Sequence, residues 1–254
     1  MKTTRSTLLK ITQSTLLGVT LATLFTACAG PRYAVQPVLN SELKSHHQQG
    51  MVVLESDKKH VVTVRPLQNQ VRAKERLKFL VAVGNQGQEP FEFSLDDVQV
   101  SDNDQPLKLY SYEEQKREIE NAAALMALAA GINAASASIN AAMPQTTYAN
   151  LSVPGGGSMN YQLTTFNPAN AAAQQAAIQA NLSSEMQAIS AGSAAQLNSL
   201  SAVLRQNTVK PGLAAGGVVM VQAVKTLGSH EIKLHVQAEQ EDHEFTFTME
   251  KLPK

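Results

Sequence analysis

Short stretches in which apolar and polar residues alternate recur in the first and last parts of the chain. A two-residue period places successive side chains on opposite faces of a β-strand. Turn-forming residues such as those from Gly84 to Gly87 separate the stretches, and this spacing predicts an antiparallel, immunoglobulin-like β-sandwich. The predicted strands are residues 51–54, 60–64, 77–83, 91–93, 98–100, 107–109, 217–224, 232–236 and 245–249.

The middle of the chain has a helical pattern instead. A first helix is expected from Glu113 to about Met143, where Pro144 stops it. A second is expected from Pro168, with Asn167 as its N-cap, to about Gln206. The connector between the two helices contains consecutive glycines, which a regular helix would not tolerate. Because predicted strands precede and follow the two helices, the expected fold class is mainly β with an inserted alanine-rich helical hairpin.

Large apolar residues in the second helix recur at steps of three and four, with Ser193 at the position between Ile189 and Leu197, which puts them on one face. We expect this face to be an interaction seam, and Ile189→Asp to disrupt assembly or folding. In the first helix Ala127, Gly131 and Ala135 are spaced four apart, which would allow close helix contact. The seam consists of Ile178, Leu182, Met186, Ile189, Leu197 and Leu200.

Three uses of the hairpin are open from the sequence. Its helices can cover only each other, they can pack against another copy or another envelope protein, or they can enter a membrane. The absence of charge from Asn121 to Ser184 favours covered surfaces over solvated ones. The asparagines and serines of the first helix make it a weak membrane span.

The N-terminus has the pattern of an export signal. Lys2, Arg5 and Lys10 precede a mainly apolar run from Ile11 to Phe25 that is short for a membrane span. The segment that follows resembles the lipobox of bacterial lipoproteins, with Phe25 in place of the usual smaller aliphatic residue. Its residues are Leu24, Phe25, Thr26, Ala27 and Cys28.

This resemblance implies that residues 1–27 are removed and that the diacylglycerol-type lipid and palmitate are carried on Cys28. Cys28 is the only cysteine, so no internal disulfide is expected. Ala29 after the cysteine implies an outer-membrane location, facing the periplasm. Residues 28–50 are rich in polar residues and are expected to be a flexible tether.

Composition and motifs give no sign of catalysis or of a cofactor. The whole chain has equal numbers of basic and acidic residues, so no nucleic-acid partner is expected. Asp96 and Asp97 are expected to be turn residues, and Gly155 to Gly157 lack the lysine of a phosphate loop. Among the histidines, only His235 and His243 are expected to approach each other, and no metal site is predicted from His46, His47, His60, His230, His235 and His243.

The sequence thus predicts a non-catalytic, lipid-anchored envelope protein that assembles through its helical hairpin with an envelope protein or with itself. A membrane-active hairpin and a ligand-binding or metal-binding periplasmic module are the alternatives. The expected division is a signal at 1–27, a tether at 28–50, sandwich strands at 51–112 and 211–254, and the inserted hairpin at 113–210.

Overall fold

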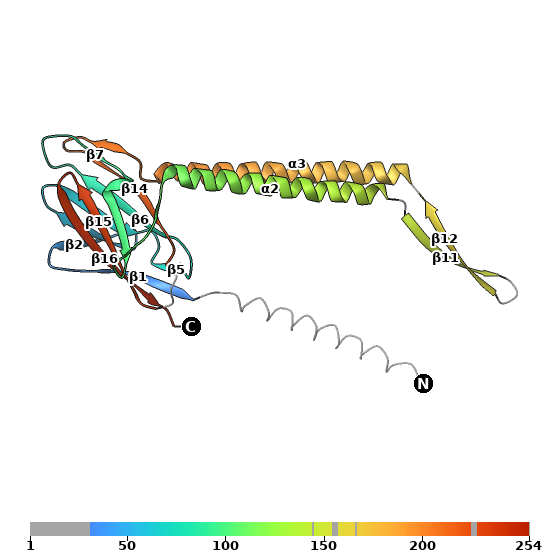
Figure 1. The fold of residues 1–254 in the computed structure, drawn as a ribbon, viewed down its shortest axis with the longest axis horizontal. Helices are drawn as coiled ribbons and strands as arrows, with labels where there is room; N and C mark the ends of the chain where they lie inside the picture. The colour runs from blue at the N-terminus through green and yellow to red at the C-terminus, as the bar shows by residue number, and fades with distance from the viewer. Residues whose placement is uncertain (1–30, 144, 154–156, 166, 225–227, 254) are drawn as a thin grey trace, which may run out of the picture. The chain divides into compact units, whose positions relative to one another are not determined.

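The computed structural model describes residues 31–143, 145–153, 157–165, 167–224 and 228–253 (Figure 1). It divides into two compact units. Among the described residues, those up to Tyr110 and from Leu204 onward form a β unit, which we call the body, and those within Ser111–Val203 form a helical unit. The predicted combination of mainly antiparallel β-structure with two helices is confirmed.

The body contains two six-stranded antiparallel sheets. In the first, the strand order is β5-β1-β16-β15-β8-β9, and in the second it is β10-β14-β6-β4-β3-β2. The first sheet comprises β1 (Arg32–Val38), β5 (Gln70–Arg72), β8 (Val98–Asp102), β9 (Gln105–Pro106), β15 (His230–Ala238) and β16 (Glu241–Lys251). The second comprises β2 (Leu43–Gln48), β3 (Met51–Asp57), β4 (Val61–Pro66), β6 (Leu77–Gly84), β10 (Leu109–Tyr110) and β14 (Ala214–Val221). A small additional pair joins β7 (Phe91–Phe93) to β13 (Asn207–Val209).

Side chains from both sheets share one hydrophobic core. Phe79 of β6 and Phe247 of β16 come from different sheets, and their ring centroids are 5.1 Å apart. Along β6 buried and half-buried residues alternate, as expected for a strand with one face on a core. The arrangement of the body is therefore sandwich-like, with two sheets packed face to face.

The predicted flexible tether is wrong over most of its length. Residues 32–38 form β1, which pairs with β16 and buries Tyr33 and Val35 in the core. Residues 43–48 form β2 at the edge of the other sheet. Since every residue of β2 is exposed except the half-buried Leu43, this edge strand has almost no apolar signal to reveal it.

The helical unit begins with α2 (Tyr112–Ala142) and ends with α3 (Pro168–Ser199) and the short η3 (Leu200–Ala202). Ser111 and Glu114 form a capping box, in which the Ser111 hydroxyl accepts from the Glu114 amide at 3.2 Å. Asn167 Oδ1 accepts from the amides of Ala169 and Asn170 at 3.1 and 3.2 Å, as its predicted role as N-cap requires. The second helix ends at Ser199, earlier than predicted.

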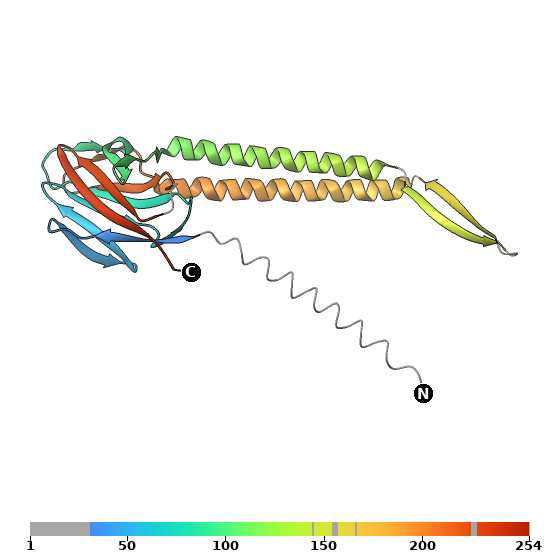
Figure 2. The same ribbon diagram turned by 60° about the horizontal axis from the view of Figure 1, so that its bottom comes forward.

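The segment between the helices is a β-hairpin rather than an irregular connector. β11 (Gln145–Val153) pairs antiparallel with β12 (Gly157–Thr165), in a register that sets Ala149 opposite Tyr161. The glycine-rich residues 154–156 that separate the strands lie outside the described residues. The two helices lie side by side and antiparallel in both views (Figures 1 and 2), so α2 and α3 form a helical hairpin.

Candidate functional site: two faces of helix α2

The face of α2 that packs on α3 is lined by alanines. Ala130 is 1% exposed, although alanine supplies only one methyl group to a contact. The other alanines on this face are half-buried, and their steps of four and three keep them on one side of the helix. We call this the inner face, and it consists of Ala123, Ala127, Ala130, Ala134, Ala137 and Ala141.

The larger side chains in this contact come from α3. Ile178, Leu182, Ile189 and Leu197 of the predicted seam are half-buried, and Leu200 in η3 is buried. Large residues of one helix thus fit against small residues of the other, which brings the two backbones close together. Five of the six seam residues therefore lie on the buried side of their own hairpin instead of presenting a surface to a partner.

Two parts of the helix predictions are wrong: the place of Met186 in the seam, and the close contact expected at Ala127, Gly131 and Ala135. Met186 is 43% exposed and does not belong to the buried seam. Of the small residues spaced four apart, only Ala127 is on the inner face, whereas Gly131 and Ala135 are exposed. A Cβ atom at Gly131 would meet nothing within 4 Å, so close helix approach does not require that glycine.

The opposite side of α2 carries most of its large apolar residues, and they are exposed. Ile132 lies two residues from both Ala130 and Ala134, so at about 3.6 residues per turn it is roughly half a turn away from each. Exposure of these residues ranges from 57% at Ile132 to 67% at Leu125. We call this the outer face, and it consists of Leu125, Leu128, Ile132, Ile139 and Met143.

The outer face is unusual because exposed leucines and isoleucines normally occur singly. A continuous apolar surface on a protein commonly marks a contact with another protein or with a membrane. Covering a leucine or isoleucine side chain completely is worth about 1.5–3 kcal/mol. No charged residue of α2 follows Glu120, so the outer face has no charge of its own to keep it in water.

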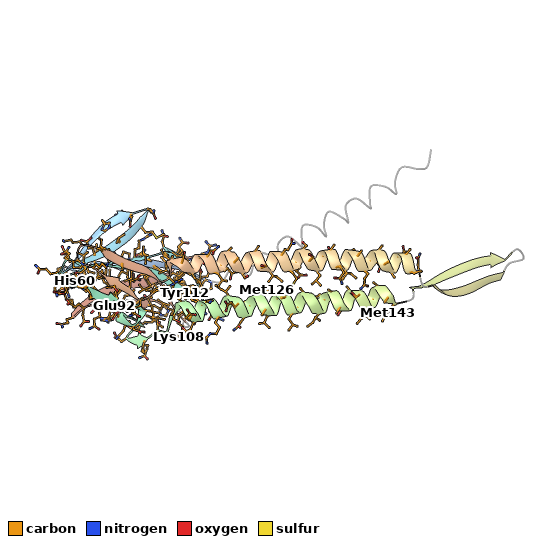
Figure 3. All side chains as sticks on the ribbon, turned by 90° about the horizontal axis from the view of Figure 1, so that it is seen from above. His60, Glu92, Lys108, Tyr112, Met126 and Met143 are labelled. Carbon is orange, nitrogen blue, oxygen red and sulfur yellow. The ribbon has the colours of Figure 1, made fainter. Side chains whose placement is uncertain are left out.

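A shallow groove of about 290 Å³ runs between the two helices. Ile119 and Met126 line it from α2, and Ile189 and Glu185 line it from α3. Figure 3 labels Met126 and Met143 along α2, the first beside this groove and the second at the end of the helix. Glu185 is the only charged residue between Asn121 and Leu204, and no ion pair to it occurs among the described residues.

By length and composition α2 could cross a membrane, and no other helix in the described part of the chain meets that criterion. Its helical partner has a different composition. The exposed residues of α3 include several glutamines and asparagines, together with Glu185. Because α3 lies along α2, insertion of the hairpin would bring these polar groups into the bilayer at a substantial cost.

The predicted lipid attachment residue, Cys28, and the signal segment 1–27 lie outside the described residues. Asp97 has a local structural role, because its carboxylate accepts from the Ser94 amide at 2.7 Å and closes a capping box. This agrees with the expectation that Asp96 and Asp97 are turn residues.

The histidines of the body occupy several separate environments. His46 and His47 are exposed on β2, while His230 Nδ1 lies 3.0 Å from a carboxylate oxygen of Asp102. The expected approach of His235 to His243 across the strands is wrong: His235 is opposite Glu244 and His243 is opposite Val236, so the two side chains lie on opposite faces of the sheet. Among the residues that the structure describes, no group of histidine, cysteine, aspartate and glutamate could hold a metal ion.

Two buried histidines lie where turns from the two sheets meet. His60, 1% exposed, has its Nε2 3.1 Å from Glu239 Oε2, and its amide donates to Glu241 at 2.9 Å. His243 is fully buried, and its Nδ1 lies 2.9 Å from Ser56 Oγ. Burial lowers the pKa of the His243 imidazole, and the positive charge of Lys58 lowers it further.

The same turns are held by ion pairs and amide contacts. Lys59 contacts the Glu239 carboxylate, and Lys59 and then His60 hold the pKa of Glu239 below its usual value. The sequence did not predict this contact, since its partners are about 180 residues apart in the chain. It joins the β3–β4 turn to the β15–β16 turn, which indicates a role in holding the two sheets together.

Comparison with known proteins assigns no relationship to this architecture. The chain matches no protein-family model, no curated protein and no solved structure in these comparisons. The fold and the candidate site together define a two-part protein, in which an antiparallel β body carries a helical hairpin with an uncovered apolar face.

Proposed function

We propose that this chain is a non-catalytic envelope protein, anchored to the outer membrane by lipid on Cys28, whose helical hairpin mediates assembly with a protein partner. In this proposal the body is a rigid, immunoglobulin-like platform and the alanine-rich hairpin is the element that associates. The observation that carries the proposal is the outer face of α2, where five large apolar residues are more than half exposed.

The proposal assigns assembly to other residues than the seam on α3. The seam first assigned to this role packs mainly against α2, so it stabilises the hairpin itself. The outer face of α2 takes its place as the partner-binding surface. Contact with a protein partner is more favourable for this face than exposure to water, because the face is apolar over several turns and the helix has no charge after Glu120.

The lipid anchor rests on the residues around Cys28 and is tested separately. Native protein should carry an acylated cysteine as its mature first residue, measured by mass spectrometry of the N-terminal peptide. A free thiol at Cys28 or an intact leader would contradict this part of the proposal. The assembly role is examined by a different experiment.

For assembly we compare Ile132→Glu with Gln187→Glu, which adds the same charge to an exposed position of α3. Ile132→Glu should reduce the size of the complex extracted in mild detergent, because a charge would be buried in an apolar contact. Gln187→Glu should leave the complex unchanged. Both variants should keep the wild-type helical circular dichroism, and an Ile132→Glu protein that remains in the full complex would contradict the proposal.

A second candidate function is insertion of the hairpin into a membrane, which the length and apolar composition of α2 favour. The two candidates differ when the lipid is removed. A Cys28→Ser protein, exported through a conventional signal peptide, should be recovered in the soluble periplasmic fraction if the hairpin binds proteins. Recovery in the membrane fraction, lost on changing Ile132 to Glu, would favour insertion.

A further inference from the structure

The outer face has a regular spacing that goes beyond its apolar character. From Leu125 to Ala142 the positions on this side follow steps of three, four, three, four and three, which is a heptad pattern over about two and a half repeats. The residues of this pattern are different from the inner-face alanines, which are also spaced by threes and fours. The pattern takes four residues of the outer face, Leu125, Leu128, Ile132 and Ile139, and adds the exposed Ala135 and Ala142; Met143, which follows the end of α2, is not part of it.

We infer that the partner on the outer face is a second copy of this chain, whose α2 packs antiparallel to the first around a two-fold axis between Asn133 and Ala134. This inference rests on the proposed function, because it names the partner of the same surface. The α2 helix thus contributes one face to its own hairpin and the opposite face to a dimer.

The order of large and small residues supports an antiparallel pair. In antiparallel helices each core layer combines the first apolar position of one heptad with the fourth position of the other. Leu125 then meets Ala142, Leu128 meets Ile139, and Ile132 meets Ala135, with each pair repeated on the other side of the axis. Large residues are placed against small ones in four of the six layers, which fills space evenly.

A parallel pair would be less favourable for two reasons. It would put Ala135 and Ala142 opposite their own copies, leaving gaps between layers of paired leucines or isoleucines. It would also continue the pattern backward onto Glu118, seven residues before Leu125, and bring two like charges together. In the antiparallel pair the positions opposite Glu118 lie beyond the end of α2.

The size and charge of the surface also fit a second copy. At about 1.5 Å per residue the stripe is about 27 Å long, and on a helix about 10–12 Å wide it covers about 300 Å², which is less than the ~800 Å² per partner of a standard interface. Two chains anchored to one membrane are held at high effective concentration, which allows a small interface to be occupied. An uncharged face complements another uncharged face, whereas it offers a charged partner no ion pairs.

Disulfide crosslinking of the full-length, membrane-anchored protein tests the arrangement. Two singly substituted chains, Leu128→Cys and Ile139→Cys, are coexpressed, and the unsubstituted chain controls for Cys28. The two different chains should form a crosslinked heterodimer under mild oxidation. Leu128→Cys alone should crosslink at least tenfold less, because the two copies of residue 128 would lie about 16 Å apart along the axis, beyond the reach of a disulfide.

Each other outcome overturns the inference in a distinguishable way. Efficient crosslinking of Leu128→Cys to itself would indicate parallel helices and contradict the antiparallel pair. Gln187→Cys is the matched surface control, and crosslinking there at an equal rate would indicate random collision. If none of the α2 cysteines crosslinks while Ile132→Glu still reduces the native complex, the partner is a different protein, so the proposed function stands and this inference fails.

Discussion

The body and the helical hairpin distribute their apolar residues in opposite ways. In the body the largest apolar side chains are inside, with Phe93, Phe245 and Phe247 fully buried. In the helical unit the most deeply buried residue of α2 is an alanine, Ala130 at 1% exposure, while Leu125 and Ile132 are exposed on the same helix. The body has covered most of its large apolar side chains by folding, whereas the hairpin leaves a row of them exposed.

This difference separates what stabilises the chain from what it can bind. Burial of large side chains supplies most of the free energy of folding, so the body has the composition of a self-sufficient domain. A hairpin held by alanines against one row of larger residues gains less on folding. Its remaining apolar surface is available to stabilise an assembly instead.

The largest expected effect is on stability, when one large side chain in each region is replaced by alanine. Phe247→Ala removes a fully buried ring that packs on Phe79, and it should lower the free energy of unfolding of the body by about 3–5 kcal/mol. Leu128→Ala removes a side chain that is 61% exposed, and its effect on a dilute, monomeric chain should be within about 0.5 kcal/mol. Urea unfolding measures both, and equal losses would show that the outer face is covered within the monomer.

A smaller effect tests the close fit of the inner face. Ala130→Leu adds three carbons at a position that is 1% exposed, so it should destabilise the hairpin by about 1–3 kcal/mol through overpacking. Ala129→Leu, at the exposed neighbouring position, is the matched control and should be nearly neutral, since alanine and leucine have similar helix propensities. Thermal melting followed at 222 nm compares them, and equal melting temperatures would mean that α2 does not use its alanines against α3.

The sequence was most informative where a residue pattern has one apolar and one polar side. Apolar and polar residues alternate strictly in β15 and β16, and Asn167 followed by Pro168 is typical of a helix start, so these elements were predicted close to their observed positions. The polar edge strand β2 and the glycine-separated β11 and β12 lack that contrast. Their pairing depends on neighbouring strands rather than on local pattern.

The candidate site could be predicted only in part for a related reason. Most of the seam on α3 was recognised as one face, because its large residues stand against polar ones, but Met186 is exposed and Leu200 lies beyond the end of the helix. On α2 both faces are apolar, one small and one large, so periodicity alone does not say which side meets α3. On α2 the large residues do not face inward, since the alanine side makes the contact with the large residues of α3.

The smallest expected effect is a loss of stability at low pH in the body but not in the helical unit. All six histidines lie outside residues 111–203, and burial lowers the pKa of His243 from its ordinary value of 6.5. The unfolded chain therefore takes up a proton at a higher pH than the folded body does. The stabilising effect of neutral His243 is complete above about pH 6.5 and is lost as pH falls toward the lowered folded value.

Urea unfolding of the body between pH 7 and 5 should show this loss, at no more than about 1.4 kcal/mol per pH unit for a single proton. His243→Gln removes the titrating group, so the slope of stability against pH should become shallower even if the variant is less stable throughout. His46→Gln, at an exposed position on β2, is the matched control and should keep the wild-type slope. Melting of the helical unit should change little over the same range, and a histidine-independent slope in the body would place the pH sensitivity in its carboxylates instead.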